Sequence, residues 1–257
     1  MSNYTVFHLH SDMSNGVTNI DSVTKFQEYI NRAAELGMTA LAFSEHGSVF
    51  GWYEKKECIE KAGMKYIHAE EFYVTEKIEL DESGSPIKLR DNMHCVLIAK
   101  NFDGVKEINR LATKSFNRKD GHYYYAPRIE LQDLLNTSDN VIVSSACLGG
   151  ILNRGNEEAQ KKFLKFLMQN KHRCFLELQH HDVEDQKVYN LKLVELHNKY
   201  GVPIIAGTDT HSLNEEHAKG RKILQLSKNI HFGEEDGWDL TFKSYDELCE
   251  AYKKQGV

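Results

Sequence analysis

Short apolar runs alternate along the chain with amphipathic segments, and this alternation predicts an α/β fold. The runs that predict strands are residues 5–9, 40–43, 66–74, 95–99, 141–144, 174–178 and 204–206. Helical periodicity covers residues 23–36, 53–62, 102–116, 157–169, 184–200 and 214–227. Strands that alternate with helices indicate a parallel sheet, and about seven such units favour a barrel related to the (β/α)8 architecture over a smaller doubly wound sheet.

Two segments depart from this alternation. Residues 77–92 contain a Gly/Ser/Pro turn and predict an inserted β-hairpin. The residues after His231 are mixed, acidic and aromatic, and their pattern predicts no particular element. Only three prolines and no Gly/Ser-rich linker favour one domain over residues 1–257, with a barrel core at about 4–212 and a C-terminal extension at about 213–257.

The composition restricts which cellular compartment and which binding partners we expect. The net charge of −6 and the pI of about 6.1 argue against bulk electrostatic capture of nucleic acid, which leaves local basic groups or metal ions to hold phosphates. Five widely spaced cysteines, an odd number, do not predict a disulfide framework. The sequence shows no signal peptide and no apolar run of membrane-spanning length, so we expect a cytoplasmic protein without a membrane partner.

Histidine, carboxylate and cysteine side chains, which can bind metals or catalyse reactions, lie at the ends of the predicted strands. The first strand ends in "FHLH", and because side chains alternate along a strand, His8 and His10 point to the same side. Later strand ends carry His46, Glu71, Cys147, His180, His181, Asp209 and His211. In a parallel barrel these ends meet at one face, where active sites lie. His94 is an exception because it precedes its apolar run, and an early strand start or a β-bulge would be needed to aim it inward.

Histidine, cysteine and carboxylate side chains together are typical ligands of transition metals. Each signal alone has a plainer interpretation: a His-x-His pair is more often structural, Cys147 suits a small buried residue, and one of Glu70 and Glu71 should face a helix or solvent. Their coincidence at one end of the barrel favours a centre of Zn, Mn or Fe. The remaining histidines are interpreted as structural or exposed: His68, His122, His172, His197, His217 and His231.

Eight motifs, in order, resemble a known family: "HLHSDMS", "LAFSEHGSVFG", "GMKYIHAEEFYV", "HCVLIAKNFDGVKEINRL", "YYYAPRI", "SSACLGG", "FLELQHH" and "GTDTHSLNEEHA". From about Tyr4 to "FKSYDEL", the chain resembles the PHP (polymerase and histidinol phosphatase) domain, especially the version at the N-terminus of the bacterial DNA polymerase III alpha subunit. The resemblance implies a distorted (β/α)7 TIM-like barrel that holds two or three divalent metal ions. It also implies the remainder of a polymerase chain as a partner, with the polymerase's catalytic aspartates outside this sequence.

The resemblance also implies the ligand sets. One metal would be held by His8, His10, Glu71 and Asp209, a second by Glu71, His94 and Cys147, and a third by His46 and His211. Asp12 or Asn15 is the candidate to complete the third site. Glu45 stands where the family usually has an aspartate, and His181 matches a family histidine to which we assign no role.

The favoured function is a metal-dependent phosphoesterase, specifically a 3′–5′ exonuclease that acts on DNA ends. Its catalytic candidates are His8, His10, Glu71 and Asp209. The segment "FNRKDGHYYYAPRIE" combines Arg118, Lys119 and Arg128 with three tyrosines and suits a single strand, although tyrosines packed on the barrel explain it as well. Two alternatives are a metal-stabilised, non-catalytic scaffold of the polymerase and a small-molecule phosphatase resembling histidinol phosphatase.

Overall fold

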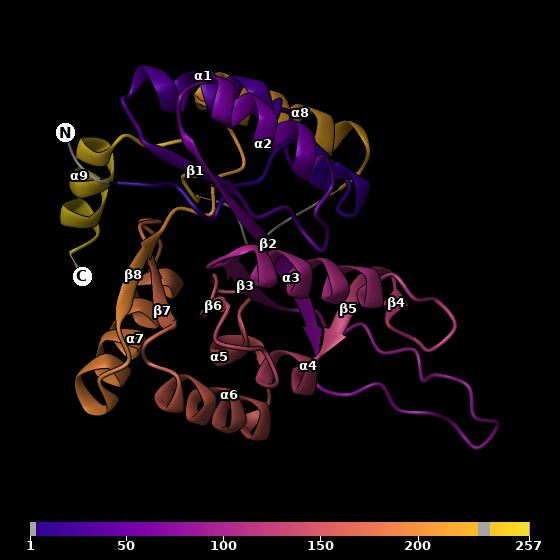
Figure 1. Ribbon diagram of the computed structural model, residues 1–257. Coiled ribbons are helices and arrows are strands. Elements are labelled where there is room, and N and C mark those ends of the chain that lie inside the picture. The colour runs from indigo at the N-terminus through magenta and orange to yellow at the C-terminus, as the bar shows by residue number, and fades with distance from the viewer. Residues whose placement is uncertain (1–3, 231–236, 257) are drawn as a thin grey trace.

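The computed structural model describes residues 4–230 and 237–256 of the chain (Figure 1). Its strands are β1 (Ala40–Phe43), β2 (Lys65–Thr75), β3 (Met93–Ala99), β4 (Tyr123–Tyr124), β5 (Ala126–Glu130), β6 (Val141–Ser144), β7 (Cys174–Gln179) and β8 (Ile204–Gly207). Its α-helices are α1 (Phe26–Glu35), α2 (Trp52–Lys61), α3 (Phe102–Ser115), α4 (Leu131–Leu135), α5 (Ile151–Arg154), α6 (Glu157–Gln169), α7 (Glu184–Tyr200), α8 (Glu215–Ser227) and α9 (Tyr245–Gln255). A 3-10 turn, η1, covers Asp12–Gly16.

The strands form one curled sheet in the order β4-β5-β2-β3-β6-β7-β8, with β1 paired to the first half of β2. Several neighbours are parallel, but β3 runs antiparallel to both β2 and β6. The expectation of a wholly parallel sheet is therefore wrong at β3. The physical reason lies in the connection between β2 and β3. A loop without a helix joins them, so the chain turns back and β3 runs antiparallel, whereas a parallel neighbour needs a crossover that is usually a helix.

The first predicted strand, residues 5–9, is extended but is not a regular strand, and it bridges β1 and the segment that follows β8. On one side, the backbone N–H groups of Ala42 and Ser44 donate to the carbonyls of Val6 and Leu9, at 3.1 and 2.9 Å. On the other side, the N–H of Thr210 donates to the carbonyl of His8 at 3.1 Å, and the carbonyl of Thr210 accepts from the N–H of His10 at 2.8 Å. These bonds close the sheet into a distorted TIM-like barrel, as expected.

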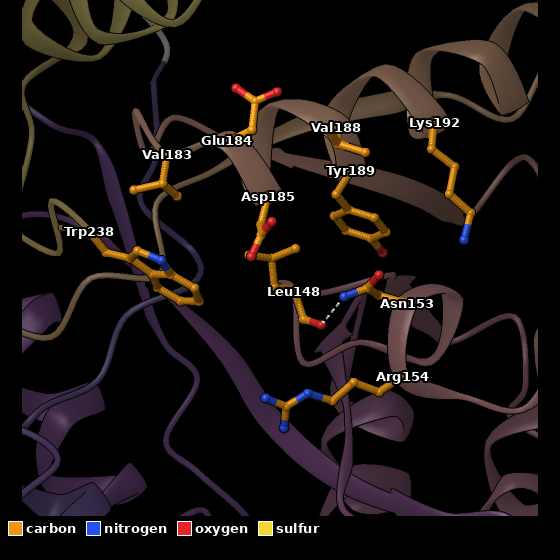
Figure 2. A pocket seen from close by; sticks show the side chains of 10 residues that line it. All are labelled: Leu148, Asn153, Arg154, Val183, Glu184, Asp185, Val188, Tyr189, Lys192 and Trp238. Atoms are coloured by element: carbon orange, nitrogen blue, oxygen red, sulfur yellow. Dashed lines mark hydrogen bonds between the residues drawn. The ribbon is translucent and has the colours of Figure 1, made fainter. Parts of the chain in front are cut away.

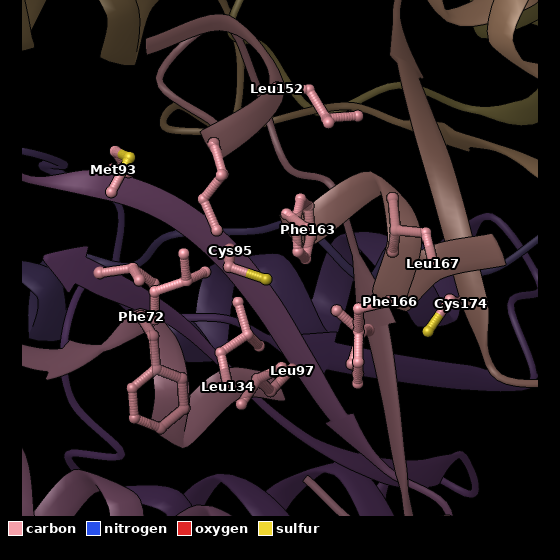
Figure 3. Packing of buried hydrophobic residues seen from close by; sticks show 14 of the residues in the cluster. Phe72, Met93, Cys95, Leu97, Leu134, Leu152, Phe163, Phe166, Leu167 and Cys174 are labelled. Atoms are coloured by element: carbon pink, nitrogen blue, oxygen red, sulfur yellow. The ribbon is translucent and has the colours of Figure 1, made fainter. Parts of the chain in front are cut away.

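Alternation along β2 and β3 separates two buried layers. Ala69 on β2 and Val96 and Ile98 on β3 point into the barrel, together with Phe7, Ala42 and Ala146. The intervening residues point outward under the helices, where a larger apolar cluster packs against α6 (Figure 3). Its members include Phe72, Cys95, Leu97, Phe163, Phe166, Leu167 and Cys174.

Three regions differ from the sequence-based expectations. Residues 77–92 leave the barrel as a long excursion (Figure 1), but their antiparallel pairing is an isolated bridge between Leu80 and Pro86 rather than a hairpin ladder. The strands β4 and β5 and the short helices α4 and α5 were not predicted, because each is too short to show a period. Beyond the sheet, α9 anchors the C-terminal extension: the hydroxyl of Tyr252 donates to the carbonyl of Leu178 at 2.6 Å.

Each of the five cysteines is a free thiol. Within residues 4–230 and 237–256, no helix has both the length and the hydropathy needed to cross a bilayer.

Candidate metal centre

The two histidines of the first segment converge on two carboxylates. Nε2 of His8 lies 3.2 Å from Oε1 of Glu71 and 3.2 Å from Oδ1 of Asp209. Nε2 of His10 lies 3.5 Å from Oε2 of Glu71 and 3.3 Å from Oδ1 of Asp209. All four side chains are buried, and their donor atoms lie close enough together to hold one metal ion.

Glu71 also faces a second set of donors. Its Oε1 lies 3.1 Å from Nδ1 of His94 and 3.8 Å from Sγ of Cys147, and these two donors are 3.4 Å apart. His94 reaches this place because β3 is antiparallel, so the start of β3 lies beside the C-terminal ends of its neighbours. The strand also begins early, at Met93 rather than at the predicted residue 95, and its unbroken register with β2 contains no bulge.

A third group combines His46, His211 and Asp21. Oδ1 of Asp21 lies 3.4 Å from Nε2 of His46 and 3.2 Å from Nδ1 of His211. Sequence reasoning missed Asp21, because it lies in a segment without a regular period, some way after His10 along the chain. Its burial beside two imidazoles is a tertiary feature that the linear pattern does not contain.

The two residues expected to complete this third group point elsewhere. The carboxylate of Asp12 pairs with the ammonium of Lys25. Oδ1 of Asn15 accepts from the backbone N–H of Asp21 at 2.6 Å, so Asn15 shapes the loop that presents Asp21. Glu45 is also outside the centre, because its buried carboxylate pairs with Lys55 and accepts from the N–H of Ser11 at 2.9 Å.

The donor atoms of the centre lie close together, but several of them make no hydrogen bond to one another. In the described part of the chain, Nε2 of His8, Nε2 of His10, Nδ1 of His46 and Oε2 of Glu71 are buried without a hydrogen bond of acceptable geometry. The ring of His10 stacks on those of His46 and His211, with centroids 4.1 and 4.4 Å apart. Buried polar atoms are normally paired, so orphaned donors that converge on shared carboxylates indicate cation sites.

Electrostatics keep the carboxylates ionised. Burial alone would raise the pKa of Glu71, but the imidazoles of His94, His8 and His46 outweigh it and hold the pKa well below its usual range. Burial likewise opposes ionisation of Asp209, yet neighbouring imidazoles, chiefly His8, hold its pKa low. These carboxylates therefore carry negative charge at neutral pH, which a divalent cation requires of its ligands.

A second layer of contacts orients His8. Its Nδ1 donates to Oε1 of Glu177 at 2.6 Å, which fixes the ring with Nε2 directed at Glu71 and Asp209. Glu177 also accepts from the hydroxyl of Ser144 at 2.5 Å. A Cβ at Gly207 would collide with the carboxylate of Glu177, so only glycine permits this close approach.

The three expected substrate-binding residues differ in exposure and in bonding partners. Arg128 is buried and donates to the carbonyls of Leu89 and Gly121 and to Asp91, so its guanidinium is bonded within the protein rather than displayed at the surface. Arg118 lies over the ring of Tyr123, 4.2 Å from its centroid, and Lys119 is exposed.

The other histidines have varied surroundings. His68 is buried and bonded to Asn109, His172 is exposed beside Asp139, and the rings of His180 and His181 are buried 4.9 Å apart. His231 lies outside the described residues.

A cavity of about 680 Å³ lies at the N-terminal half of α7, between that helix, Leu148 and Trp238 (Figure 2). Leu148 on its wall directly follows Cys147, and Trp238 on another wall stacks on His181 with ring centroids 5.1 Å apart. The remaining lining residues are Asn153, Arg154, Val183, Glu184, Asp185, Val188, Tyr189 and Lys192. The cavity thus combines an aromatic surface with charged groups of both signs.

Comparison with known proteins identifies the class to which this barrel and centre correspond. Residues 7–181 match the PHP domain, and the chain belongs to the PHP domain family.

Its relatives include DNA polymerase III subunit alpha of Borreliella burgdorferi, 30% identical over 98% of this chain and 22% of the relative. The subunit alpha of Aquifex aeolicus is 33% identical over 87% of this chain and 20% of the relative. The chain therefore spans about a fifth of the length of these relatives. A solved structure of a putative metal-dependent phosphoesterase from Bifidobacterium adolescentis shares the fold, with a TM-score of 0.51 and 12% identity, covering 98% of this chain and 96% of that one.

Proposed function

We propose that the chain is a metal-dependent phosphoesterase that removes nucleotides from the 3′ end of DNA. The observation that carries the proposal is the shared carboxylate of Glu71, which faces His8, His46 and His94 at once. Such a carboxylate can bridge neighbouring cations, as a multinuclear hydrolytic site requires. The proposed ligands are His8, His10, Asp21, His46, Glu71, His94, Cys147, Asp209 and His211.

Bound divalent ions would supply a hydroxide near neutral pH and neutralise phosphoryl oxygens. The protein's own part is to position the ions and keep their ligands in the right protonation state. Glu177 fixes the proton of His8 on Nδ1, so that Nε2 is available as a ligand. The identity of the ions, Zn, Mn or Fe, is left open by a donor set of imidazole, carboxylate and thiolate.

We place the terminal nucleotide in the cavity whose wall includes Leu148, the residue after Cys147. Trp238 offers a ring on which a base could stack, and the guanidinium of Arg154 lies on the cavity wall (Figure 2). A local arrangement of this kind suits a chain whose net charge is −6, because it does not depend on a basic surface. The relatives that are polymerase alpha subunits support a role alongside a polymerase.

The decisive experiment is an exonuclease assay on a 3′-labelled single strand with protein loaded in turn with Zn²⁺, Mn²⁺ or Fe²⁺. We expect release of mononucleotides that is abolished by a chelator and by His10→Ala, and retained in the surface control His172→Ala. Failure of every metal-loaded form, together with a large fall in melting temperature on chelation, would favour a structural scaffold. Turnover of histidinol phosphate but not of DNA would favour the small-molecule phosphatase.

A further inference from the structure

A second cluster of metal-ligand side chains lies at the junction of β5 and α4. It consists of His122, Glu130 and Asp133, whose donor atoms lie within 4.8 Å of one another. The cluster shares no residue with the centre around Glu71. The sequence alone gave His122 a structural or exposed role.

His122 has the features of a metal ligand. Its side chain is 7% exposed, and Nε2 is buried without a hydrogen-bond partner among the described residues. Its Nδ1 lies 2.7 Å from Oδ1 of Asp120. Because the carboxylate accepts from Nδ1, the Nε2 lone pair is left to point at the cluster, which is the arrangement that carboxylates impose on metal-bound histidines.

The two carboxylates are held side by side by a helix cap. Glu130 precedes α4, and its backbone N–H donates to Oδ2 of Asp133 at 3.1 Å in a capping box. That same Oδ2 lies 4.0 Å from Nε2 of His122. A cation could lie between these two atoms. A small inward movement of both side chains would bring each atom to a metal–ligand distance of about 2.1 Å.

A cationic side chain already uses part of this site. Nζ of Lys114 lies 2.6 and 2.8 Å from the two oxygens of Asp133. Lys114 is partly exposed, with 38% of its side chain accessible, so its ammonium can move into solvent. A metal ion and Lys114 would therefore compete for Asp133.

We infer that His122, Glu130 and Asp133 form a separate site for a divalent transition-metal ion such as Zn²⁺. One imidazole and two carboxylates match the ligand preference of such ions, and water would complete the coordination. The ion would fix the turn that carries His122 to the start of α4, so its binding would stabilise the folded chain. This inference does not depend on the proposed phosphoesterase activity.

The test compares Zn²⁺ binding by the purified protein and its variants after removal of metal with a chelator. Elemental analysis in buffered Zn²⁺ should show one equivalent fewer in His122→Asn than in the wild type. The matched control His172→Asn alters an exposed histidine that also pairs with an aspartate, and it should bind as the wild type does. Lys114→Met should fill the site at about tenfold lower free Zn²⁺, because the competing ammonium is removed.

The variants His122→Asn and Lys114→Met are expected to act in opposite directions, which separates metal binding from damage to the fold. Loss of one equivalent in His122→Asn together with tighter binding in Lys114→Met supports the site. Unchanged stoichiometry in His122→Asn, with no shift in Lys114→Met, would overturn it and leave a cluster of hydrogen bonds and one ion pair without a metal ion.

Discussion

The two faces of β2 carry neighbouring glutamates in opposite settings. Glu71 points into the barrel, where three imidazoles lie within 3.2 Å of its oxygens. Glu70 points the other way, is equally buried, and has no hydrogen-bond partner for either oxygen within the described residues. Burial alone raises the pKa of Glu70 well above its usual value, whereas the imidazoles hold the pKa of Glu71 well below its usual value.

The difference teaches that burial by itself does not identify a functional carboxylate. Both glutamates are fully buried, and they are adjacent in sequence. Positively charged neighbours decide the charge of a buried carboxyl group. With imidazoles beside it the group is ionised and can bind a metal, and without them it is neutral. Four substitutions would sharpen this comparison.

The largest effect is expected for Glu71→Gln. The amide keeps the shape of the side chain but cannot bridge cations as a carboxylate does, so the phosphoesterase rate should fall by about 1000-fold. Steady-state rates and metal content would be measured together. Glu70→Gln is the matched control, since it makes the same change one residue away, and equal losses in both variants would contradict the comparison.

If the proposed centre holds an ion at His46 and His211, Asp21→Asn should remove that ion and lower the proposed phosphoesterase rate by about 100-fold. The reason is that Asp21 is the carboxylate shared by His46 and His211. Asp12→Asn is the control, because Asp12 pairs with Lys25 outside the centre. A full complement of metal in Asp21→Asn would exclude Asp21 as a ligand.

Glu177→Gln should weaken metal binding by about tenfold, as expected for a partner that orients a ligand rather than binding the ion. The amide can still accept from Nδ1 of His8, but its negative charge is lost. Metal affinity would be measured by titration after chelation. An affinity equal to that of the wild type would show that orientation alone, without charge, suffices.

The smallest effect is expected on stability from Glu70→Gln. Because the folded pKa of Glu70 is raised above its usual value of 4.5, its contribution to stability is complete below pH 4.5 and is lost as the pH rises toward the folded pKa. Glutamine does not titrate, so the variant should gain stability over the wild type by up to about 1.4 kcal/mol for each pH unit above 4.5, until the folded pKa of Glu70 is reached. Urea unfolding at several pH values would test this, with the exposed Glu82→Gln as control, and parallel pH profiles would refute it.

Much of the fold could be predicted because it depends on local periodicity. The bounds of β6, α6 and α7 agree with the apolar pattern to the residue. The direction of β3 could not be predicted, since an apolar run reads the same whether its strand is parallel or antiparallel. That direction is what carries His94 to the centre.

The sequence by itself determined the residue types available for chemistry and the strand ends on which most of them lie. Only the tertiary structure decided that Asp21 joins His46 and His211 and that Arg128 is bonded to backbone carbonyls. It also decided that Glu71 meets three imidazoles, whereas the carboxyl group of Glu70 has no hydrogen-bond partner in the described part of the chain. The physical reason is that donor atoms become partners through distances of a few ångströms between segments far apart in the chain, and those distances are set by packing.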